Sequence, residues 1–339
     1  MAIVAPGPEA IEKAVGLLRR GELVALPTET VYGLGADALN PEAVARIFAA
    51  KGRPADHPLI VHLPDAEHLT RWASRVPREA IALARAFWPG PLTLILPRDP
   101  MVPDAVTGGQ DTVGLRVPGH PVALALLKAF DSGIAAPSAN RFGRISPTTA
   151  QHVEEELGDR VAMILDGGAC DVGIESTILD LSGNIPRILR PGAISAERIA
   201  AVIGRMPEQV TKVSAASGGT TPRVSGSLAA HYAPTTALVL VEHAELDAEI
   251  RRRAANAERI AVYARHADNA GVSVHIWLRA PDTAEAYAHD LYAALRALDA
   301  SGADMILLET PPADPEWSAI HDRLGRAAVG SGTGTGTAT

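Results

Sequence analysis

Cysteine is nearly absent from this chain, because Cys170 is the only one in 339 residues. A single thiol excludes an intramolecular disulfide and any zinc site made from several cysteines. It is typical of proteins from the reducing cytoplasm, where we expect this one to reside. No neighbour in the sequence would stabilise a thiolate here, so we interpret Cys170 as a structural residue and not as a nucleophile.

Long apolar runs are also missing. No window approaches 18 uninterrupted apolar residues, so we expect no membrane-spanning segment. Residues 1–6 have neither a basic region nor an apolar stretch, and we expect no signal peptide. With 47% hydrophobic and 21% charged residues, the chain is globular in composition and long enough for two domains.

Several familiar site motifs are absent as well. The sequence has no Gly-x4-Gly-Lys-Ser/Thr loop and no Gly-x-Gly-x-x-Gly, which argues against P-loop and dinucleotide-binding sites. It also lacks the Gly-x-Ser-x-Gly elbow of serine hydrolases.

Positive charge is scarce and unevenly distributed. The net charge is −8, the wrong sign for a protein that coats nucleic acid. Residues 235–327 hold 15 acidic and 9 basic residues, which leaves 24 acidic and 22 basic residues elsewhere. An anion-binding site is therefore expected in the first part of the chain, as a local cluster of cations.

The pattern of apolar runs predicts an α/β protein with two domains. Over residues 1–204, irregularly alternating strands and helices favour an open, mixed, twisted sheet with helices. Residues 205–234 lack a periodic pattern and are interpreted as a linker or lid. Residues 235–328 predict a smaller α/β, Rossmann-like domain, and the Gly- and Thr-rich tail at 329–339 is expected to be disordered.

Local signals predict individual elements of the first domain. Asn40-Pro41 is typical of a helix start, and that helix should end near Gly52. Ser146 is expected to cap a later helix. Residues 28–35 are compatible with an ordinary turn.

Five polar segments end or follow the predicted strands, where open α/β sheets bind ligands. They are residues 27–35, 51–54, 137–140, 173–177 and 189–192. Each alone has a structural interpretation, since a lysine followed by glycine often ends a helix. Together they suit a polyphosphate: Lys51 and Arg53 supply differently placed cations, and Ser138 and Asn140 supply a hydroxyl and an amide.

Six motifs in this order resemble the YrdC-like family of threonylcarbamoyl-AMP synthases. The motifs are residues 27–38, Lys51-Gly52-Arg53-Pro54 with 58–62, Pro89-Gly90-Pro91-Leu92-Thr93, 113–118, Pro137-Ser138-Ala139-Asn140, and Glu175-Ser176-Thr177. Residues 227–234 and the carboxyl-terminal half are similar to the two-domain form of that family, so the resemblance covers about residues 5–327.

The resemblance implies a nucleotidyltransferase. It would form L-threonylcarbamoyladenylate and pyrophosphate from L-threonine, bicarbonate or CO2, and ATP with Mg²⁺. The product would pass to a tRNA threonylcarbamoyl transferase, which modifies adenosine in tRNA. The resemblance implies no metal ligand among the protein side chains.

The resemblance also implies roles for individual residues. The catalytic group would be Lys51, Arg53, Ser138 and Asn140. The ATP contacts would be Arg53, His57, Thr112, Ser138, Ser146, Arg190, His231 and Tyr232. The threonine contacts would be Thr30, His62, Arg116, Ser176 and the backbone of Ala136.

The sequence differs from the usual pattern of the family in two places, and two other functions are considered beside this one. His57 stands where many relatives have asparagine, and the linker motif 223–232 differs from the commoner form, so residues 205–234 could be a lid or a passive tether. An RNA-binding or ribosome-assembly module, with weak RNA affinity, is one rival. A carbamoyltransferase that forms carbamoyl-adenylate is the other, although a chain with one cysteine cannot supply its zinc fingers.

Overall fold

The structure is a computed structural model that describes residues 3–209, 222–266, 271 and 273–333. Its internal contacts divide the chain into two compact units, Met1–Phe142 with Pro147–Ser227, and Gly143–Ser146 with Leu228–Thr339. The mixed α/β fold with a large twisted sheet confirms the predicted fold class. Among the described residues, no helix combines the length and the apolar character needed to cross a membrane.

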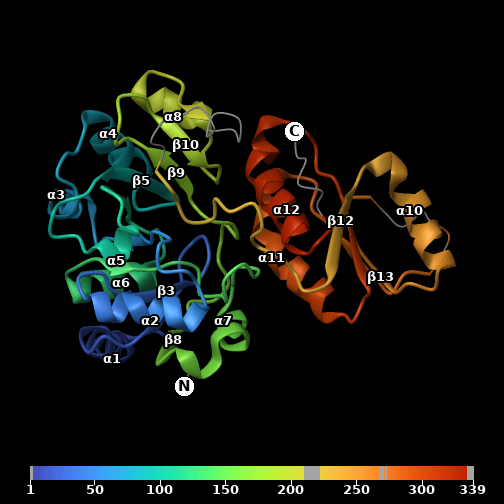
Figure 1. The fold of residues 1–339 in the computed structure, drawn as a ribbon, viewed down its shortest axis with the longest axis horizontal. Coiled ribbons are helices and arrows are strands. Elements are labelled where there is room, and N and C mark those ends of the chain that lie inside the picture. The colour runs from blue at the N-terminus through green and yellow to red at the C-terminus, as the bar shows by residue number, and fades with distance from the viewer. Residues whose placement is uncertain (1–2, 210–221, 267–270, 272, 334–339) are drawn as a thin grey trace. The chain divides into compact units, whose positions relative to one another are not determined.

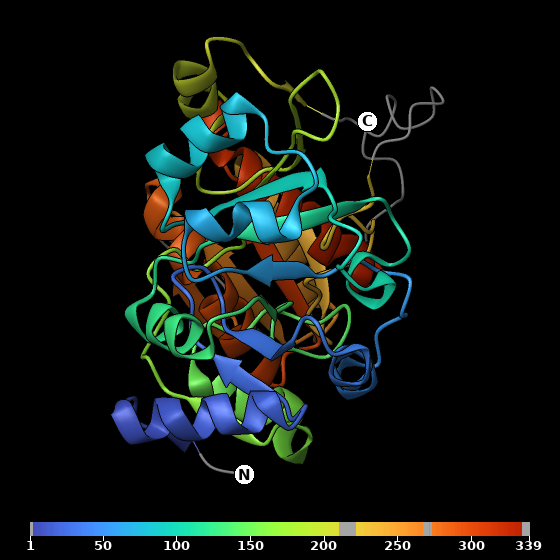
Figure 2. The same ribbon diagram turned by 90° about the vertical axis from the view of Figure 1, so that its left-hand side faces the viewer.

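The described strands of the first unit form a single 11-stranded sheet (Figures 1 and 2). Its order is β1-β8-β2-β3-β7-β4-β6-β5-β9-β10-β11, with parallel and antiparallel neighbours. The strands are β1 (Ile3–Val4), β2 (Val24–Leu26), β3 (Gly33–Asp37), β4 (Ile60–His62), β5 (Leu92–Pro97), β6 (Thr112–Arg116), β7 (Ile134–Ala135), β8 (Met163–Leu165), β9 (Thr177–Asp180), β10 (Arg187–Arg190) and β11 (Glu208–Gln209).

Helices cover both faces of this sheet. They are α1 (Pro8–Arg19), α2 (Pro41–Lys51), α3 (Leu69–Trp72), α4 (Arg78–Phe87), α5 (Asp104–Thr107), α6 (Pro121–Phe130), α7 (Ala150–Leu157) and α8 (Ala196–Ile203). Along β2, Val24 and Leu26 join the apolar cluster of α1 and α6, whereas Ala25 joins the opposite cluster, which includes α2 and α4. This alternation follows from the two-residue period of a strand.

Helix α2 begins and ends as the sequence predicts. The Asn40 side chain accepts hydrogen bonds from the backbone N–H groups of Glu42 and Ala43, and Pro41 occupies the first helical position. Gly52 follows the helix in the left-handed conformation, with φ 62°. The helix therefore delivers Lys51 on its last turn and turns the chain sharply before Arg53.

One local prediction for the first unit is wrong, and the interpretation of residues 28–35 as a turn holds only in part. Residues 29–31 bend, whereas residues 33–37 form strand β3, paired with β2, where the glycines at 33 and 35 allow close packing. Helix α7 is capped by the Thr149 hydroxyl, which accepts from the His152 N–H at 3.3 Å; Ser146 does not cap it. Helix α8 was not predicted at all.

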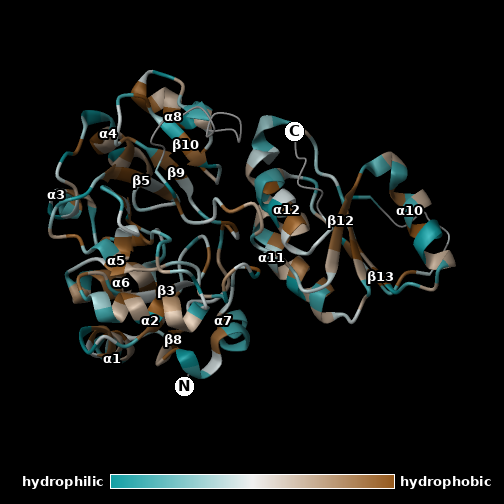
Figure 3. Ribbon diagram, in the orientation of Figure 1, coloured by the Kyte–Doolittle hydropathy of each residue, from teal (hydrophilic) through white to brown (hydrophobic). Residues whose placement is uncertain are grey.

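The second unit is a four-stranded parallel sheet with helices. Its order is β12-β15-β13-β14, formed by β12 (Ala237–Val241), β15 (Met305–Glu309), β13 (Ile260–Ala264) and β14 (Ile276–Arg279). Its helices are α10 (His243–Ala255), α11 (Ala284–Ala300) and α12 (Ser318–Gly330). In Figure 3, β12 and β13 are mostly brown whereas α10 carries teal, as expected for buried strands and an exposed helix.

The tail and the linker are partly described. Helix α12 continues to Gly330, and the Ser331 hydroxyl accepts a hydrogen bond from the Leu238 N–H at 3.0 Å. Order therefore extends into the segment predicted to be a disordered tail, whose residues 334–339 lie outside the described residues. Residues 210–221 of the predicted linker also lie outside them.

Candidate active site

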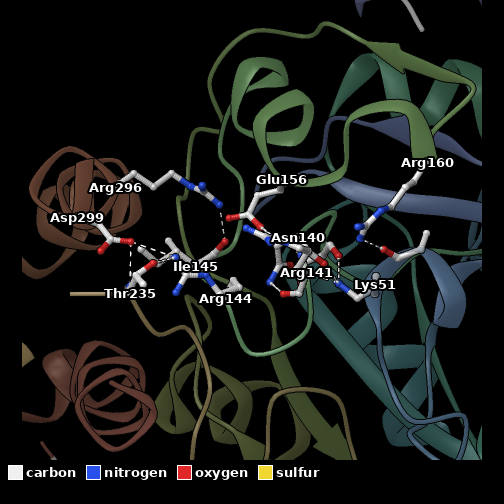
Figure 4. Close-up of polar contacts among 12 residues, drawn as sticks. Lys51, Asn140, Arg141, Arg144, Ile145, Glu156, Arg160, Thr235, Arg296 and Asp299 are labelled. Atoms are coloured by element: carbon white, nitrogen blue, oxygen red, sulfur yellow. Dashed lines mark hydrogen bonds and ion pairs between the residues drawn. The ribbon is translucent and has the colours of Figure 1, made fainter. Parts of the chain in front are cut away.

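Lys51 connects the end of α2 to the loop that follows β7. Its side chain is buried, and Nζ donates to the carbonyl oxygens of Ser138 at 2.5 Å and Asn140 at 2.6 Å. A longer contact of 3.4 Å reaches Oδ1 of Asn140 (Figure 4). Three acceptors match the three donors of a protonated ammonium. The structure thus brings together Lys51, Ser138 and Asn140, three residues of the predicted catalytic group, and Ser138 contacts Lys51 through its backbone carbonyl and not through its hydroxyl.

The surroundings of Lys51 also set its protonation. Burial, and then the positive charge of Arg53, hold the pKa of Lys51 well below its ordinary value of 10.5. Glu156 and Glu175 oppose this shift. Lys51 therefore loses its proton at a lower pH than a surface lysine does, and an anion bound beside it would raise its pKa.

The loop 138–142 is held from several sides. The N–H of Phe142 donates to the carbonyl of Lys51 at 2.8 Å, and that of Ala139 donates to the carbonyl of Tyr32 at 2.8 Å. Figure 4 shows Arg141 beside Glu156, whose Oε2 accepts from the Arg141 N–H at 3.3 Å. The loop is therefore fixed to α2, to the start of β3 and to α7.

Arg53 points to a different set of groups. Its Nη2 donates to the carbonyl of Pro58 at 3.0 Å and to the hydroxyl of Ser225 at 3.3 Å. Arg190 also reaches this serine, donating from Nη1 to its carbonyl at 3.0 Å. One residue of the linker, Ser225, thus joins two buried arginines of the candidate ATP site.

Arg190 is anchored to Ser176 as well. Its Nε and Nη2 donate to the Ser176 carbonyl at 3.1 and 3.0 Å, and Nη2 also lies 3.1 Å from the Ser176 hydroxyl. That hydroxyl shares a 2.8 Å hydrogen bond with Thr93. Gly192 allows the close approach of the two segments, because a Cβ there would lie 2.4 Å from the Thr177 nitrogen.

A second buried group centres on Arg116. Its Nη1 donates to the Thr30 hydroxyl at 3.0 Å, its Nε donates to the Gly90 carbonyl at 3.2 Å, and Nη2 lies 2.7 Å from Oε1 of Glu29. This last contact is an ion pair without the alignment of a hydrogen bond. Glu29 is held on its other side by the N–H of Gly119, at 2.8 Å from Oε2.

His62 belongs to the same group by strand register. Strands β4 and β6 pair so that His62 lies opposite Arg116. Burial, followed by the charge of Arg116, holds the pKa of His62 well below its ordinary value, so the imidazole is neutral. Its buried Nδ1 has no hydrogen-bond partner among the described residues, which leaves it available to a ligand.

The remaining predicted nucleotide contacts in the first unit lie near Arg53 or beside the linker. The His57 ring packs edge-on against Phe142 with 5.5 Å between ring centroids, and burial and then the charge of Arg53 lower its pKa, which favours the neutral imidazole. Thr112 lines a shallow groove together with Pro58 and Ser225. Ala136, whose backbone is a predicted threonine contact, donates its N–H to the Ile60 carbonyl at 3.0 Å.

Three predicted ATP contacts, Ser146, His231 and Tyr232, lie in the second unit. Its segment Gly143–Ser146 is held there by Arg144, which contacts Asp299 at 3.1 Å, and by Arg296, which donates to the Ile145 carbonyl (Figure 4). The Tyr232 ring stacks on Tyr292 with 5.8 Å between centroids.

Sequence reasoning missed three residues of these networks: Glu29, Thr93 and Ser225. Glu29 lies between two threonines in the polar segment 27–35, and a single acidic residue among hydroxyls could have indicated a partner for a buried cation. Nothing in the sequence distinguishes Ser225. The predicted structural role of Cys170 agrees with its burial, which raises the pKa of its thiol.

The protein is an α/β protein of a class suited to anionic ligands. Its mixed sheet has buried cations and hydroxyls around the strand ends, and the same chain forms a smaller unit with a parallel sheet. Family models for "Telomere recombination" and "Threonylcarbamoyl-AMP synthase, C-terminal domain" match residues 16–192 and 194–329. The chain belongs to the two-domain threonylcarbamoyl-AMP synthase family.

Individual relatives resemble the chain over nearly its whole length. The threonylcarbamoyl-AMP synthase of Pyrococcus abyssi is 41% identical over 97% of this chain and 98% of its own. That of Bacillus subtilis is 43% identical over 94% and 93%. The crystal structure of P. abyssi Sua5 complexed with L-threonine superposes with a TM-score of 0.90 at 39% identity, covering 98% of both chains.

The lowered pKa of Lys51 predicts proton uptake when ATP binds at alkaline pH. Without a ligand, Lys51 begins to lose its proton below pH 10.5, and bound phosphates would raise its pKa again. ATP binding should therefore take up protons at a pH between these two pKa values. Calorimetry in buffers of different ionisation enthalpy measures this uptake. The permanently charged Lys51→Arg should not take up protons, whereas Lys128→Arg, at an exposed position, should behave like the wild type. Equal uptake in Lys51→Arg and wild type would contradict the prediction.

Proposed function

We propose that the protein joins L-threonine, bicarbonate or CO2, and ATP into L-threonylcarbamoyladenylate and pyrophosphate. A tRNA threonylcarbamoyl transferase would use this product to modify adenosine in tRNA, in the cytoplasm. Family membership supports the proposal. The observation that carries it is the network of buried cations in the first unit, where Lys51 binds Ser138 and Asn140 while Ser225 joins Arg53 to Arg190.

The chemistry requires two anions to meet. The amino group of threonine forms a carbamate with CO2 and loses a proton, and a carbamate oxygen attacks the α-phosphorus of ATP while the bond to pyrophosphate breaks. Lys51, Arg53 and Arg190 would neutralise the phosphates, and Ser138 and Asn140 would orient them. Fixed positioning of both reactants can lower a barrier by about 7–11 kcal/mol in favourable cases.

Mg²⁺ would enter this site as part of the ATP substrate. The first unit presents ammonium, guanidinium, hydroxyl and amide groups around the predicted phosphates. Among the described residues, the one grouping of three potential metal-ligating side chains is in the second unit. Phosphate oxygens and water would therefore supply most ligands of the ion, which would share the neutralisation of charge.

The Arg116–Glu29 pair suits a zwitterionic amino acid. Arg116 would bind the carboxylate of threonine, because a guanidinium matches two carboxylate oxygens. Glu29 would bind the ammonium before it reacts, and the unaligned 2.7 Å contact between the two side chains would open in exchange for these partners. Thr30, His62, Ser176 and the Ala136 backbone would complete this pocket.

We further propose residues 205–234 as the linker of the enzyme, with 223–225 acting as a lid on the nucleotide side. In support, Val224 is buried against Ile95 and Ile178, and Arg223 pairs with Asp56 at 3.2 Å. A lid that closes on a substrate excludes water and completes the site.

Removal of one cation of the predicted catalytic group tests the function directly. Arg53→Ala and Lys51→Ala should each lower threonine-dependent pyrophosphate release by about a hundredfold or more, since each removes a charge aimed at the transferred group. Arg85→Ala and Lys128→Ala, at exposed positions, are the matched controls. Circular dichroism should confirm that all variants fold. Near-normal release by both site variants would refute the assignment, and RNA affinity without turnover would support the RNA-binding rival.

Arg116→Lys tests the threonine pocket. Loss of the bidentate contact with the threonine carboxylate should raise the threonine KM about tenfold or more, because a hydrogen bond to a charged group contributes about 1.5–3 kcal/mol. The ATP KM should change little. Steady-state kinetics with each substrate varied in turn measures the two effects, with Arg19→Lys at an exposed position as control. Equal changes in both KM values would count against the role.

Val224→Asp tests the lid. The carboxylate could not stay in its apolar contact, so residues 223–225 should detach and turnover should fall about tenfold or more. Leu228→Asp makes the same change at a linker position that is 36% exposed and should leave turnover near normal. If both variants turn over like the wild type, the linker is a passive tether.

A further inference from the structure

Three adjacent strands of the second unit end at one cluster of side chains. Glu309 is the last residue of β15, which pairs in parallel with both β12 and β13. His243 is the first residue of α10, directly after β12, and His266 follows the end of β13. The carboxyl ends of parallel strands share one edge of the sheet, the usual position of a ligand site in such folds (Figure 1).

The geometry of this cluster brings two imidazole nitrogens to one carboxylate oxygen. Nδ1 of His266 lies 2.7 Å, and Nδ1 of His243 lies 3.4 Å, from Oε1 of Glu309. The ring centroids of the two histidines are 3.8 Å apart. One donor atom from each of the three residues lies within 4.8 Å of the others, which is close enough for a single ion to contact all three.

The carboxylate is fixed from behind while the imidazoles face solvent. The Glu309 side chain is fully buried, and its Oε2 accepts from the N–H of Arg265 at 2.8 Å. The side chains of His243 and His266 are 61% and 47% exposed. A backbone donor that orients a ligating carboxylate is a regular feature of metal sites, and open solvent supplies the remaining ligands.

Arg265 places a guanidinium beside the cluster. Its Nη2 lies 3.5 Å from Oε1 of Glu309, a loose contact, and its guanidinium lies 5.7 Å from the centre of the Trp317 ring. A bound cation would replace this guanidinium at Oε1, and Arg265 could keep its position over the ring and its backbone bond to Oε2.

We propose that His243, His266 and Glu309 bind a divalent first-row transition-metal ion of the Zn²⁺ class. Two imidazoles and one carboxylate are a donor set that such ions favour, and three protein ligands leave positions for water. The ion would join the ends of three strands and stabilise the second unit. The site is independent of the function proposed for the first unit.

Metal titration of the untagged full-length protein, after chelator treatment, tests this site. We expect one equivalent of Zn²⁺ by calorimetry and, with Co²⁺ as a spectroscopic probe, a visible absorption band. His243→Ala, His266→Ala and Glu309→Gln should each weaken Zn²⁺ affinity more than tenfold, since even outer contacts of metal sites cost about 10–100-fold. Zn²⁺ should also raise the thermal unfolding temperature of the wild type.

His289→Ala is the matched control. Its Nδ1 lies 2.7 Å from Oδ1 of Asp290, so it has the same imidazole–carboxylate contact but is outside the three-residue cluster, and its affinity should equal that of the wild type. The two exposed histidines can be changed without disturbing the core, so they decide the result even if Glu309→Gln does not fold. A wild type that binds neither Zn²⁺ nor Co²⁺, or unchanged affinity in both histidine variants, would overturn the proposal.

Discussion

The buried ammonium of Lys51 is the interaction on which the first unit's site depends. A lone charge in a protein interior is strongly unfavourable, and this one is accommodated because two backbone carbonyls and an amide oxygen surround it. The same contacts fix the loop 138–140 against the end of α2. Charge and positioning therefore come from one side chain: the group that would neutralise a phosphate also holds in place the residues that would orient it.

Arg116 and Glu29 apply the same principle to the other predicted substrate. The pair is buried, so its two charges compensate each other when no ligand is bound. Removing either partner would leave an unpaired buried charge, which is costly. A bound amino acid can take over both contacts, because its carboxylate would pair with Arg116 and its ammonium with Glu29. The neutral His62 beside them can accept or donate a hydrogen bond without disturbing this balance.

Local chemistry predicted much of the fold, whereas pairing across the sheet could not be predicted. The Asn40 cap and the Gly52 end of α2 are encoded within a few residues, so the helix and the place of Lys51 followed from sequence. The partnership of Arg116 with Glu29 depends on how β6 and the 27–32 segment come together, which no local pattern specifies. Ser225 lies in a segment without periodicity, and only the folded chain shows that it bonds two arginines.

The central claim is that one fixed set of cations and hydroxyls binds both anionic reactants. A crystal structure with a non-hydrolysable ATP analogue and L-threonine measures this most directly. The account predicts phosphate oxygens within hydrogen-bond distance of Arg53, with Lys51 close enough to neutralise their charge while it keeps its contacts with Ser138 and Asn140. It also predicts the threonine carboxylate on Arg116, with the ion pair between Arg116 and Glu29 opened. A nucleotide bound away from these side chains, or a threonine that leaves the Arg116–Glu29 pair closed, would contradict it.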